Sequence, residues 1–399
     1  MLSKIHLLLM STGGFILFIG SLIIANPSSA QKSAENTVAR RKINLKLVAE
    51  HKKNVLLDIS DDGRLLLTHQ TSTPVHRYTI PEVGAAQAHQ SPPFDDRLRV
   101  VERESGREVG SVPVDFFTYN RLFVPGTKQV FYMEPQPSSQ PRDWHYKLWL
   151  PVTGQNLICS ETSDGAPNSL VFLDQQHAVG SIWMEGSGDV LVQLSFPGCV
   201  FKRMGPIDPT DPKRRVRGKI AVSPDKKTLA YDSGTHIIIR DNTSNEVIKR
   251  LDSGSLFFTG QLSYTPDGKS LIALACASKC LSADEEGTFY LWFYDTTNYK
   301  MTRQLEVPRL NTFAISPDSQ LLAVSYKLQK RSFLKTVEQG NIDIYELATG
   351  RKLTTASHPP VEVRRENLWA ADINYLNFTP DGKYLMSSTY DTRIWRVGE

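Results

Sequence analysis

The stretch TPDGKYLMSS, Thr379 to Ser388, is one of five similar phrases in this chain. The others are SDDGRLLLTH from Ser60, SPDKKTLAYD from Ser223, TPDGKSLIAL from Thr265 and SPDSQLLAVS from Ser316. In each, hydrophobic runs flank Pro-Asp-Gly or a close variant. Proline fixes φ at the first turn position, aspartate bonds to nearby backbone amides, and glycine accepts a positive φ. Each phrase therefore predicts a hairpin whose two strands are the flanking runs.

Two further strands follow each hairpin. The third strands are rich in aromatic or β-branched residues: THIIIRD from Thr235, TFYLWFYD from Thr288, NIDIYEL from Asn341 and TRIWRV from Thr392. A turn rich in Gly or Asn leads to a short fourth strand such as EVIKRL from Glu246. Four strands per repeat, with about forty residues as the minimal unit, indicate a β-propeller.

The same template fits the earlier, less regular part of the chain as three more blades, over about 55–102, 116–159 and 169–204. The last repeat stops after its third strand, at Val397, and INLKLV from Ile43 is available as its fourth. Pairing these segments would close the ring and hide its sheet edges. We predict an all-β fold over 43–399: a seven-bladed β-propeller of four-stranded antiparallel blades, the N-terminal strand closing the last. Six or eight blades would require one misassigned segment.

These phrases, with third strands such as IWRV and LWFYD, resemble the WD40-repeat propellers and their bacterial relatives. The resemblance covers about 43–399 and is strongest from 219 onward. It departs from the family in two respects, because no Gly-His dipeptide precedes the repeats and no Trp-Asp closes a third strand. The buried His–Asp–Ser/Thr–Trp network typical of the family cannot be mapped, so the resemblance implies the architecture and no site residues. We interpret Trp149, Trp292 and Trp395 as packing between blades.

The N-terminus has the order of a secretory signal. Lys4 precedes an apolar run from Leu7 to Ala25, and Asn26-Pro27 and small residues follow. Cleavage after Ala30 would release the domain, whereas a retained run could anchor it in a bilayer through residues 7–25. We assign 1–30 to a signal peptide or signal anchor and 31–42 to a linker, and we expect an exported protein, periplasmic or extracellular.

Four cysteines lie in the exported part, which an oxidising compartment allows to form two disulfides. Cys276 and Cys280 are close enough in sequence to staple a loop. A Cys159–Cys199 pair depends on the fold. No second Cys or His pair accompanies CASKC, which argues against zinc, and the spacing of His69, His76 and His89 matches no ligand motif. We expect no metal and no cofactor.

Catalytic signatures are absent from the sequence: there is no GxSxG, P-loop, HExxH or GxGxxG motif. A formal charge of +4 on 399 residues does not indicate a nucleic-acid binder. The 40% of hydrophobic residues is enough for a large core and argues against disorder. The chain is therefore interpreted as a folded protein without a known catalytic motif. An enzyme stays open, because propeller active sites are assembled from scattered residues near the channel mouth.

Loop lengths point to a functional face. Turns between strands one and two, and between three and four, share one side of a propeller and are short here. Nearly all insertions belong to the other side: 69–96, 135–145, 204–218, 276–287, 327–340 and 357–372. Binding residues commonly lie in loops on a rigid scaffold. The candidates are basic and aromatic, suited to carboxylates, phosphates or acidic glycans: Trp144, Arg214, Arg215, Arg217, Arg331, Arg365 and Trp369. Lys327, Lys330 and Lys335 belong to the same set. The alternative is an ordinary solvated loop surface.

Three functions stay open, because propellers host all of them. The first is a non-catalytic platform that binds a protein or another anionic polymer through the long loops. The alternative is a hydrolase or lyase at the channel mouth, which would require a His or carboxylate with a partner near the channel. The third is a small-ligand sensor. We favour the platform, with no nucleic acid as partner and the membrane contacted only through an uncleaved N-terminal segment.

Overall fold

The computed structural model describes residues 43–70, 96–114, 118–135, 144–162, 167–184, 188–208, 210, 220–233, 236–254, 256–277, 288–308, 310–331, 335–363 and 371–398. The chain divides at Arg40/Arg41, and the described residues all belong to the second unit. They form strands and turns only, and none of them builds a helix long and apolar enough to cross a membrane.

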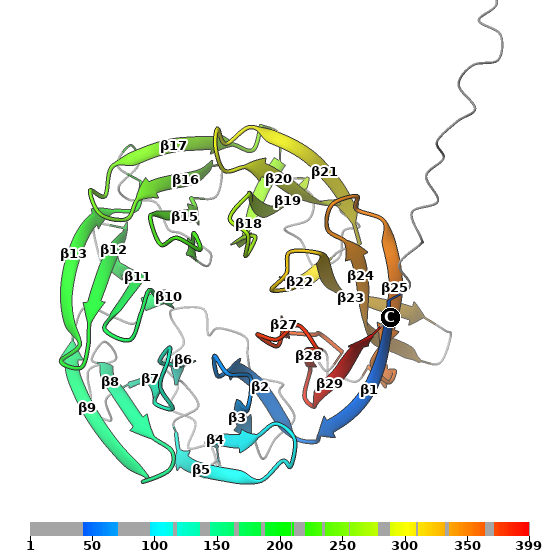
Figure 1. Ribbon diagram of the computed structural model, residues 1–399, viewed down its shortest axis with the longest axis horizontal. Helices are drawn as coiled ribbons and strands as arrows, with labels where there is room; N and C mark the ends of the chain where they lie inside the picture. Colours follow the sequence, from blue (N-terminus) through cyan, green and yellow to red (C-terminus); the bar gives the residue numbers. More distant parts are fainter. Residues whose placement is uncertain are drawn as a thin grey trace, which may run out of the picture. The chain divides into compact units, whose positions relative to one another are not determined.

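The second unit is a ring of seven antiparallel sheets, so the predicted seven-bladed β-propeller is confirmed (Figure 1). Blade one contains β2 (Asn54–Ile59), β3 (Leu65–Gln70), β4 (Arg97–Glu102) and β5 (Glu108–Pro113). Blade two contains β6 (Tyr119–Phe123), β7 (Val130–Pro135), β8 (Trp144–Leu150) and β9 (Gln155–Thr162). Blade three contains β10 (Pro167–Phe172), β11 (His177–Met184), β12 (Gly188–Ser195) and β13 (Val200–Pro206). The weakly patterned part of the sequence therefore adopts the predicted strands.

Blades four to seven follow the repeated phrase. They contain β14 (Ala221–Val222), β15 (Thr228–Asp232), β16 (His236–Asp241) and β17 (Val247–Asp252); β18 (Leu256–Tyr264), β19 (Ser270–Ala277), β20 (Phe289–Asp295) and β21 (Met301–Val307); β22 (Leu310–Ile315), β23 (Leu321–Arg331), β24 (Thr336–Glu346) and β25 (Lys352–Ser357), with β26 (Val361–Glu362) beside β24; β27 (Tyr375–Phe378), β28 (Tyr384–Ser388), β29 (Thr392–Gly398) and β1 (Asn44–His51).

The ring is closed by the N-terminal strand, as predicted. β1 pairs antiparallel with β29 from Asn44 opposite Gly398 to His51 opposite Thr392. Glu50 on β1 also forms an ion pair with Arg393 on β29. Residues from the two ends of the sequence thus share one blade, and the sheet edge that β29 would otherwise expose is covered.

Each repeated phrase forms the turn between the first two strands of a blade. In the last one, Thr379 Oγ1 donates to Asp381 Oδ1 at 2.5 Å, and the Lys383 amide donates to the same oxygen at 3.0 Å. Gly382 has φ +68°. The Ser or Thr that opens the phrase is therefore part of the turn, because its hydroxyl fixes the aspartate that in turn fixes the backbone.

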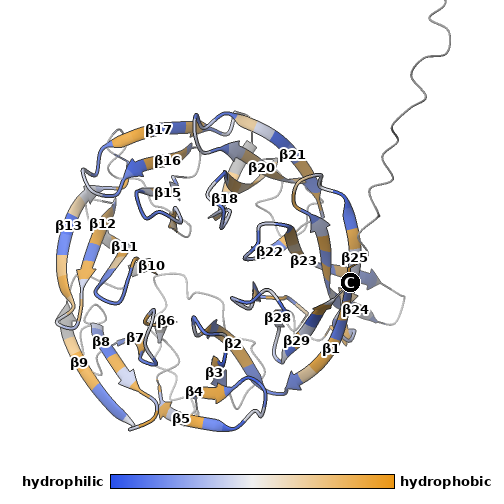
Figure 2. Cartoon of the chain, viewed as in Figure 1, coloured by the Kyte–Doolittle hydropathy of each residue, from blue (hydrophilic) through white to orange (hydrophobic). Residues whose placement is uncertain are grey.

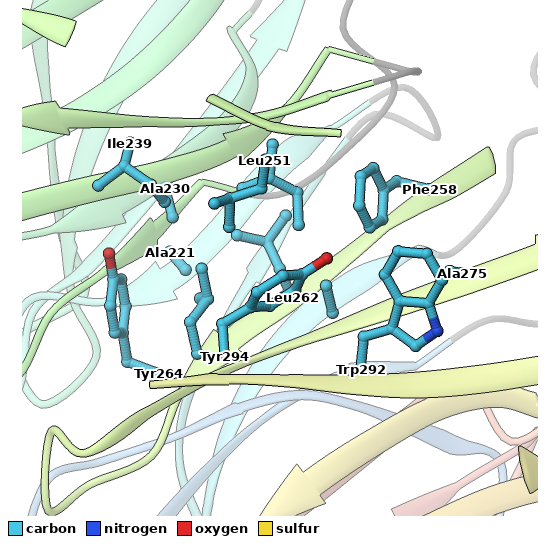
Figure 3. Packing of buried hydrophobic residues seen from close by; sticks show 13 residues of the cluster. Ala221, Ala230, Ile239, Leu251, Phe258, Leu262, Tyr264, Ala275, Trp292 and Tyr294 are labelled. Carbon is cyan, nitrogen blue, oxygen red and sulfur yellow. The ribbon is translucent and has the colours of Figure 1, made fainter. Parts of the chain in front are cut away.

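The core lies between adjacent blades rather than at the centre of the ring. Hydrophobic residues concentrate on the strands and hydrophilic ones at the turns (Figure 2). Between blades four and five, Ala230 and Ile239 pack near Tyr264 and Trp292 (Figure 3). Trp149 and Trp395 are buried in the equivalent clusters of other blade pairs. The prediction that these tryptophans pack between blades is confirmed.

Blade seven contains most of the buried network that could not be mapped from the sequence: the Trp395 indole donates to Ser387 Oγ at 2.8 Å, and His358 Nε2 lies 2.8 Å from the same oxygen. Arg393 donates to His358 Nδ1 at 2.6 Å. His358 follows the fourth strand of blade six and is preceded by Ser357 rather than by glycine, so no Gly-His dipeptide marks it. Arg393 is also paired with Glu50 of β1.

A disulfide joins Cys159 on β9 to Cys199 beside β13, with 5.5 Å between the Cα atoms. It ties the outer strands of blades two and three. Cys276 on β19 is also disulfide-bonded. Cys280, its predicted partner, lies outside the described residues.

Candidate functional site

The predicted segregation of the insertions follows from the strand order. We call long-loop face the side of the ring formed by connections between second and third strands and from each fourth strand to the next blade. All six insertions join strand ends of this class. The opposite side, the short-turn face, is formed by the other connections, of which none is longer than residues 124–129. The rigid strands therefore present every long excursion on one side.

Trp144 is the candidate whose side chain the structure describes, and its role is partly structural. It begins β8, opposite Pro135 on β7, and it packs against the hydrophobic cluster between blades two and three. Its indole is half-buried. Trp144 thus anchors the base of the 136–143 insertion as well as bordering the face.

The insertion that contains Arg331 is a strand extension rather than a loop. β23 and β24 continue as a paired hairpin from Lys327 opposite Gly340 to Arg331 opposite Thr336, and β26 pairs with β24 at Val337 and Glu338. Only the backbone of Arg331 is described. Arg214, Arg215, Arg217, Arg365 and Trp369 lie outside the described residues, so their roles stay predictions.

Lys327 does not extend the basic surface as the sequence suggested. Its Nζ lies 3.1 Å from both Glu338 Oε2 and Asp372 Oδ1. Gln329 donates to Glu338 at 3.0 Å, and Asn311 on the innermost strand of blade six donates to Asp372 at 3.4 Å. Two carboxylates therefore compensate the ammonium charge. Lys330 and Lys335 in the same hairpin are exposed.

A second polar group lies at the base of the first insertion. His69, at the end of β3, has its Nε2 3.8 Å from Asp96 Oδ1, and Arg121 of blade two lies 3.3 Å from Nδ1. Burial, and then the charge of Arg121, lower the pKa of His69 to about 3. His69 and Asp96 are at most 2% exposed. His69 is therefore neutral, and the His–carboxylate pair is closed to solvent. These properties favour a structural contact between blades over acid–base catalysis.

The sequence could not have identified these two groups. Glu338 and Asp372 come from different blades, and His69, Asp96 and Arg121 are brought together only when blades one and two pack. The one usable signal was the position of His69 and Asp96 at the two ends of the same insertion.

Comparison with known proteins supports the fold. No protein-family model matches the chain, and no curated protein matches its sequence. Among solved structures, a chain of a mitotic checkpoint complex is similar with a TM-score of 0.53 and 11% identity, over 95% of this chain and 100% of that one. The Dos1 propeller is similar with a TM-score of 0.51 and 12% identity, over 88% of this chain and 95% of that one. At such identities the likeness is one of fold alone.

Proposed function

We propose that the protein is a non-catalytic β-propeller that binds acidic segments of a partner protein, or another acidic polymer, through its long-loop face. The observation that carries this proposal is the placement of all six insertions on one side of a rigid ring. Their basic and aromatic residues are suited to carboxylates and to anchoring contacts. A likeness to propellers within assemblies agrees with a partner-binding role without naming the partner.

The alternative, a hydrolase or lyase at the channel mouth, has less support. Among the described residues, the His–carboxylate pair on the long-loop face is buried, and the Lys327 cluster consists of ion pairs that satisfy one another. Neither offers a solvent-accessible acid or base with a partner. These observations favour binding over catalysis.

The proposal is tested by removing charge from each face in turn. We expect the full chain to bind immobilised poly-L-glutamate and the variant with Arg214, Arg215 and Arg217 changed to Ser to bind about 10-fold more weakly, since exposed ion pairs contribute up to about 1 kcal/mol each. The matched control removes three lysines from the short-turn face: Lys128, Lys227 and Lys269, each changed to Ser. Both variants should keep the thermal stability of the parent. Equal binding by all three proteins, or equal loss in both variants, would remove the long-loop face from consideration.

We also propose that the protein is exported. The Cys159–Cys199 disulfide agrees with an oxidising compartment, where such bonds persist. Intact-mass measurement of the chain recovered from envelope fractions should give a polypeptide that begins at Gln31. A mass that retains residues 1–30 in a membrane fraction would assign the apolar run to an anchor instead.

A further inference from the structure

A hollow of about 470 Å³ lies on the short-turn face at the point where the ring is closed. Three parts of the chain line it: the β22–β23 turn with Pro317 and Asp318, the β27–β28 turn with Pro380 and Asp381, and the strand ends around Ile43 and Gly398. It is on the opposite side of the ring from the insertions.

The hollow arises from the way the last blade is completed. In blades four and five, the residue after the third strand donates to the start of the second, as Asn242 does to Lys227 O at 2.8 Å and Thr296 does to Lys269 O at 3.1 Å. The chain then turns directly into the fourth strand. In blade seven Val397 makes the equivalent bond to Lys383 O at 2.8 Å. However, β29 and β1 come from distant parts of the sequence, so no turn joins them beside the hollow.

The lining of the hollow is mixed: Ile43, Leu321, Pro317 and Pro380 supply apolar groups, and Asp318, Asp381 and Lys383 supply charged ones. Ile43 and Leu321 line the hollow and are buried. Pro317 packs against the next turn, since a Cβ on Gly382 would lie 3.8 Å from Pro317 Cδ. Pro380 is fixed in the same way against blade one. Because proline rings are locked in φ and these turns are hydrogen-bonded, the hollow is preformed and a ligand would not have to order it.

The rim carries carboxylates held in fixed orientations. Asp318 Oδ1 accepts from Ser316 Oγ at 2.5 Å and from the Gln320 amide at 3.0 Å. Within the described part of the chain, Asp318 Oδ2 has no such partner, and no basic side chain forms an ion pair with it. Asp381 has the same turn bonds but lies near Arg103 and Lys383. Asp318 is therefore the carboxylate that a ligand cation could approach.

We propose that this hollow binds an extended peptide segment of a partner protein that presents a basic side chain next to an apolar one. The apolar side chain enters between Pro317 and Pro380, onto Ile43 and Leu321. The basic side chain reaches Asp318 Oδ2. The volume lies within the usual range of small-ligand and side-chain pockets. The site is independent of the proposed long-loop function.

The test uses the full chain and two capped peptides, acetyl-Gly-Arg-Leu-Gly-amide and acetyl-Gly-Glu-Leu-Gly-amide, titrated by ligand-observed NMR. We expect the arginine peptide to bind and the glutamate peptide to bind at least 5-fold more weakly. Asp318→Asn should weaken the arginine peptide by a similar factor, since the amide oxygen keeps the turn bonds but the charge is lost. The matched control is Asp225→Asn, in the same turn of blade four, where Ser223 and Lys227 make the equivalent bonds. It should leave binding within 2-fold of the parent.

Three results would overturn the proposal: equal binding of the two peptides, an unchanged affinity in Asp318→Asn, or an equal loss in Asp225→Asn. A fourth result would also overturn it. If the arginine peptide binds only after Arg40, Arg41 and Lys42 are changed to Gln, the hollow is assigned to the chain's own basic segment. Failure here is distinguishable from failure of the proposed function. The long-loop arginine variant should bind the arginine peptide normally, and Asp318→Asn should bind poly-L-glutamate normally.

Discussion

Glycine in the repeated turn has two roles: it adopts a positive φ, and it lets the turn pack closely against the turn of the neighbouring blade. Gly63 and Gly268 both have φ near +70°, which a residue with a Cβ adopts only at a cost. Each also lies against the proline of the preceding blade's turn: a Cβ on Gly63 would be 3.1 Å from Pro380 Cδ, and one on Gly268 would be 3.9 Å from Pro224 Cγ. Where blade six has Ser319 instead, its hydroxyl accepts from the Asp267 amide of blade five at 3.0 Å. The phrase therefore repeats because each copy also packs against its neighbour.

This double role can be separated by mutation. Gly63→Ala should cost about 1 kcal/mol for the positive φ and about 1 kcal/mol more for the crowding against Pro380. Gly154→Ala is the control, because Gly154 has φ +72° but nothing within 4 Å of its Cβ position. We expect Gly63→Ala to lower the thermal unfolding midpoint about twice as much as Gly154→Ala. Equal shifts would contradict a packing role for Gly63.

The buried histidines make stability depend on pH. Burial, and then Arg393, lower the pKa of His358 to about 3, far below its ordinary value of 6.5. Between these two pKa values the unfolded chain binds a proton that the folded chain does not, so the free energy of unfolding rises with pH. The contribution of His358 to stability is therefore lost progressively as pH falls below about 6.5. Each such histidine contributes a slope of about 1.4 kcal/mol per pH unit there.

His358→Gln removes one of these contributions. Its amide can replace the contacts to Ser387 and Arg393 without taking up a proton. We expect the variant's stability, measured by denaturant unfolding between pH 4 and pH 6, to change less steeply by about 1 kcal/mol per pH unit. A His358→Gln curve parallel to the parent would exclude this role.

At the scale of elements, the strands were predictable wherever turn chemistry and hydrophobic runs coincide. The repeated phrase predicted the hairpins of blades four to seven. The segments TRIWRV and INLKLV were also predicted to pair across the closure, and they do so. The β23–β24 extension was not predicted, because KLQKR from Lys327 and TVEQG from Thr336 are as polar as a loop. They become strands by pairing with each other and through the Lys327–Glu338 contact. Trp144 was likewise read only as a surface residue, since its contact with the cluster of blades two and three requires their packing.

The Cys159–Cys199 disulfide joins two outer strands 40 residues apart in sequence. A cross-link that closes a loop of this size stabilises the folded state by about 2–4 kcal/mol, mainly by restricting the unfolded chain. The variant with both cysteines changed to Ser should therefore unfold at a lower temperature than the parent. Reducing agent should lower the parent's midpoint by more than the variant's, whose remaining response comes from Cys276. A midpoint unchanged in the variant would show that the interface is held by its hydrophobic contacts alone.

At the scale of the whole molecule, the sequence predicts the number of blades, the closure and the side on which the insertions lie. It does not predict the hollow at the closure, because Ile43 and Gly398 are brought together only when the ring is complete. It also does not predict the pairing of Arg393, since Glu50 reaches it from the opposite end of the chain. The strand pairing across the closure was predictable from two hydrophobic runs, but the side-chain partners that it brings together from the two ends of the sequence were not.

The closure gives the last prediction. A chain that begins at Arg41 retains β1 and should unfold like the parent. A chain that begins at Lys52 loses the partner of β29, the buried Ile43 side chain and the carboxylate that pairs with Arg393, whose side chain is only 6% exposed. We expect it to be less stable by about 4 kcal/mol or more, since burying an isoleucine contributes about 1.5–3 kcal/mol and a partly buried cation is left unpaired.

The exposed edge of β29 should also make this shorter chain self-associate, which size-exclusion chromatography would detect. A synthetic peptide with the sequence INLKLVAEH, residues 43–51, should restore the thermal midpoint and the monomeric elution volume. The same peptide with its glutamate changed to Gln should restore the pairing with β29 but less of the stability, because Arg393 would still lack a charged partner. If the chain from Lys52 unfolds like the chain from Arg41, the ring does not depend on its N-terminal strand, and the preformed hollow beside that strand loses its physical basis.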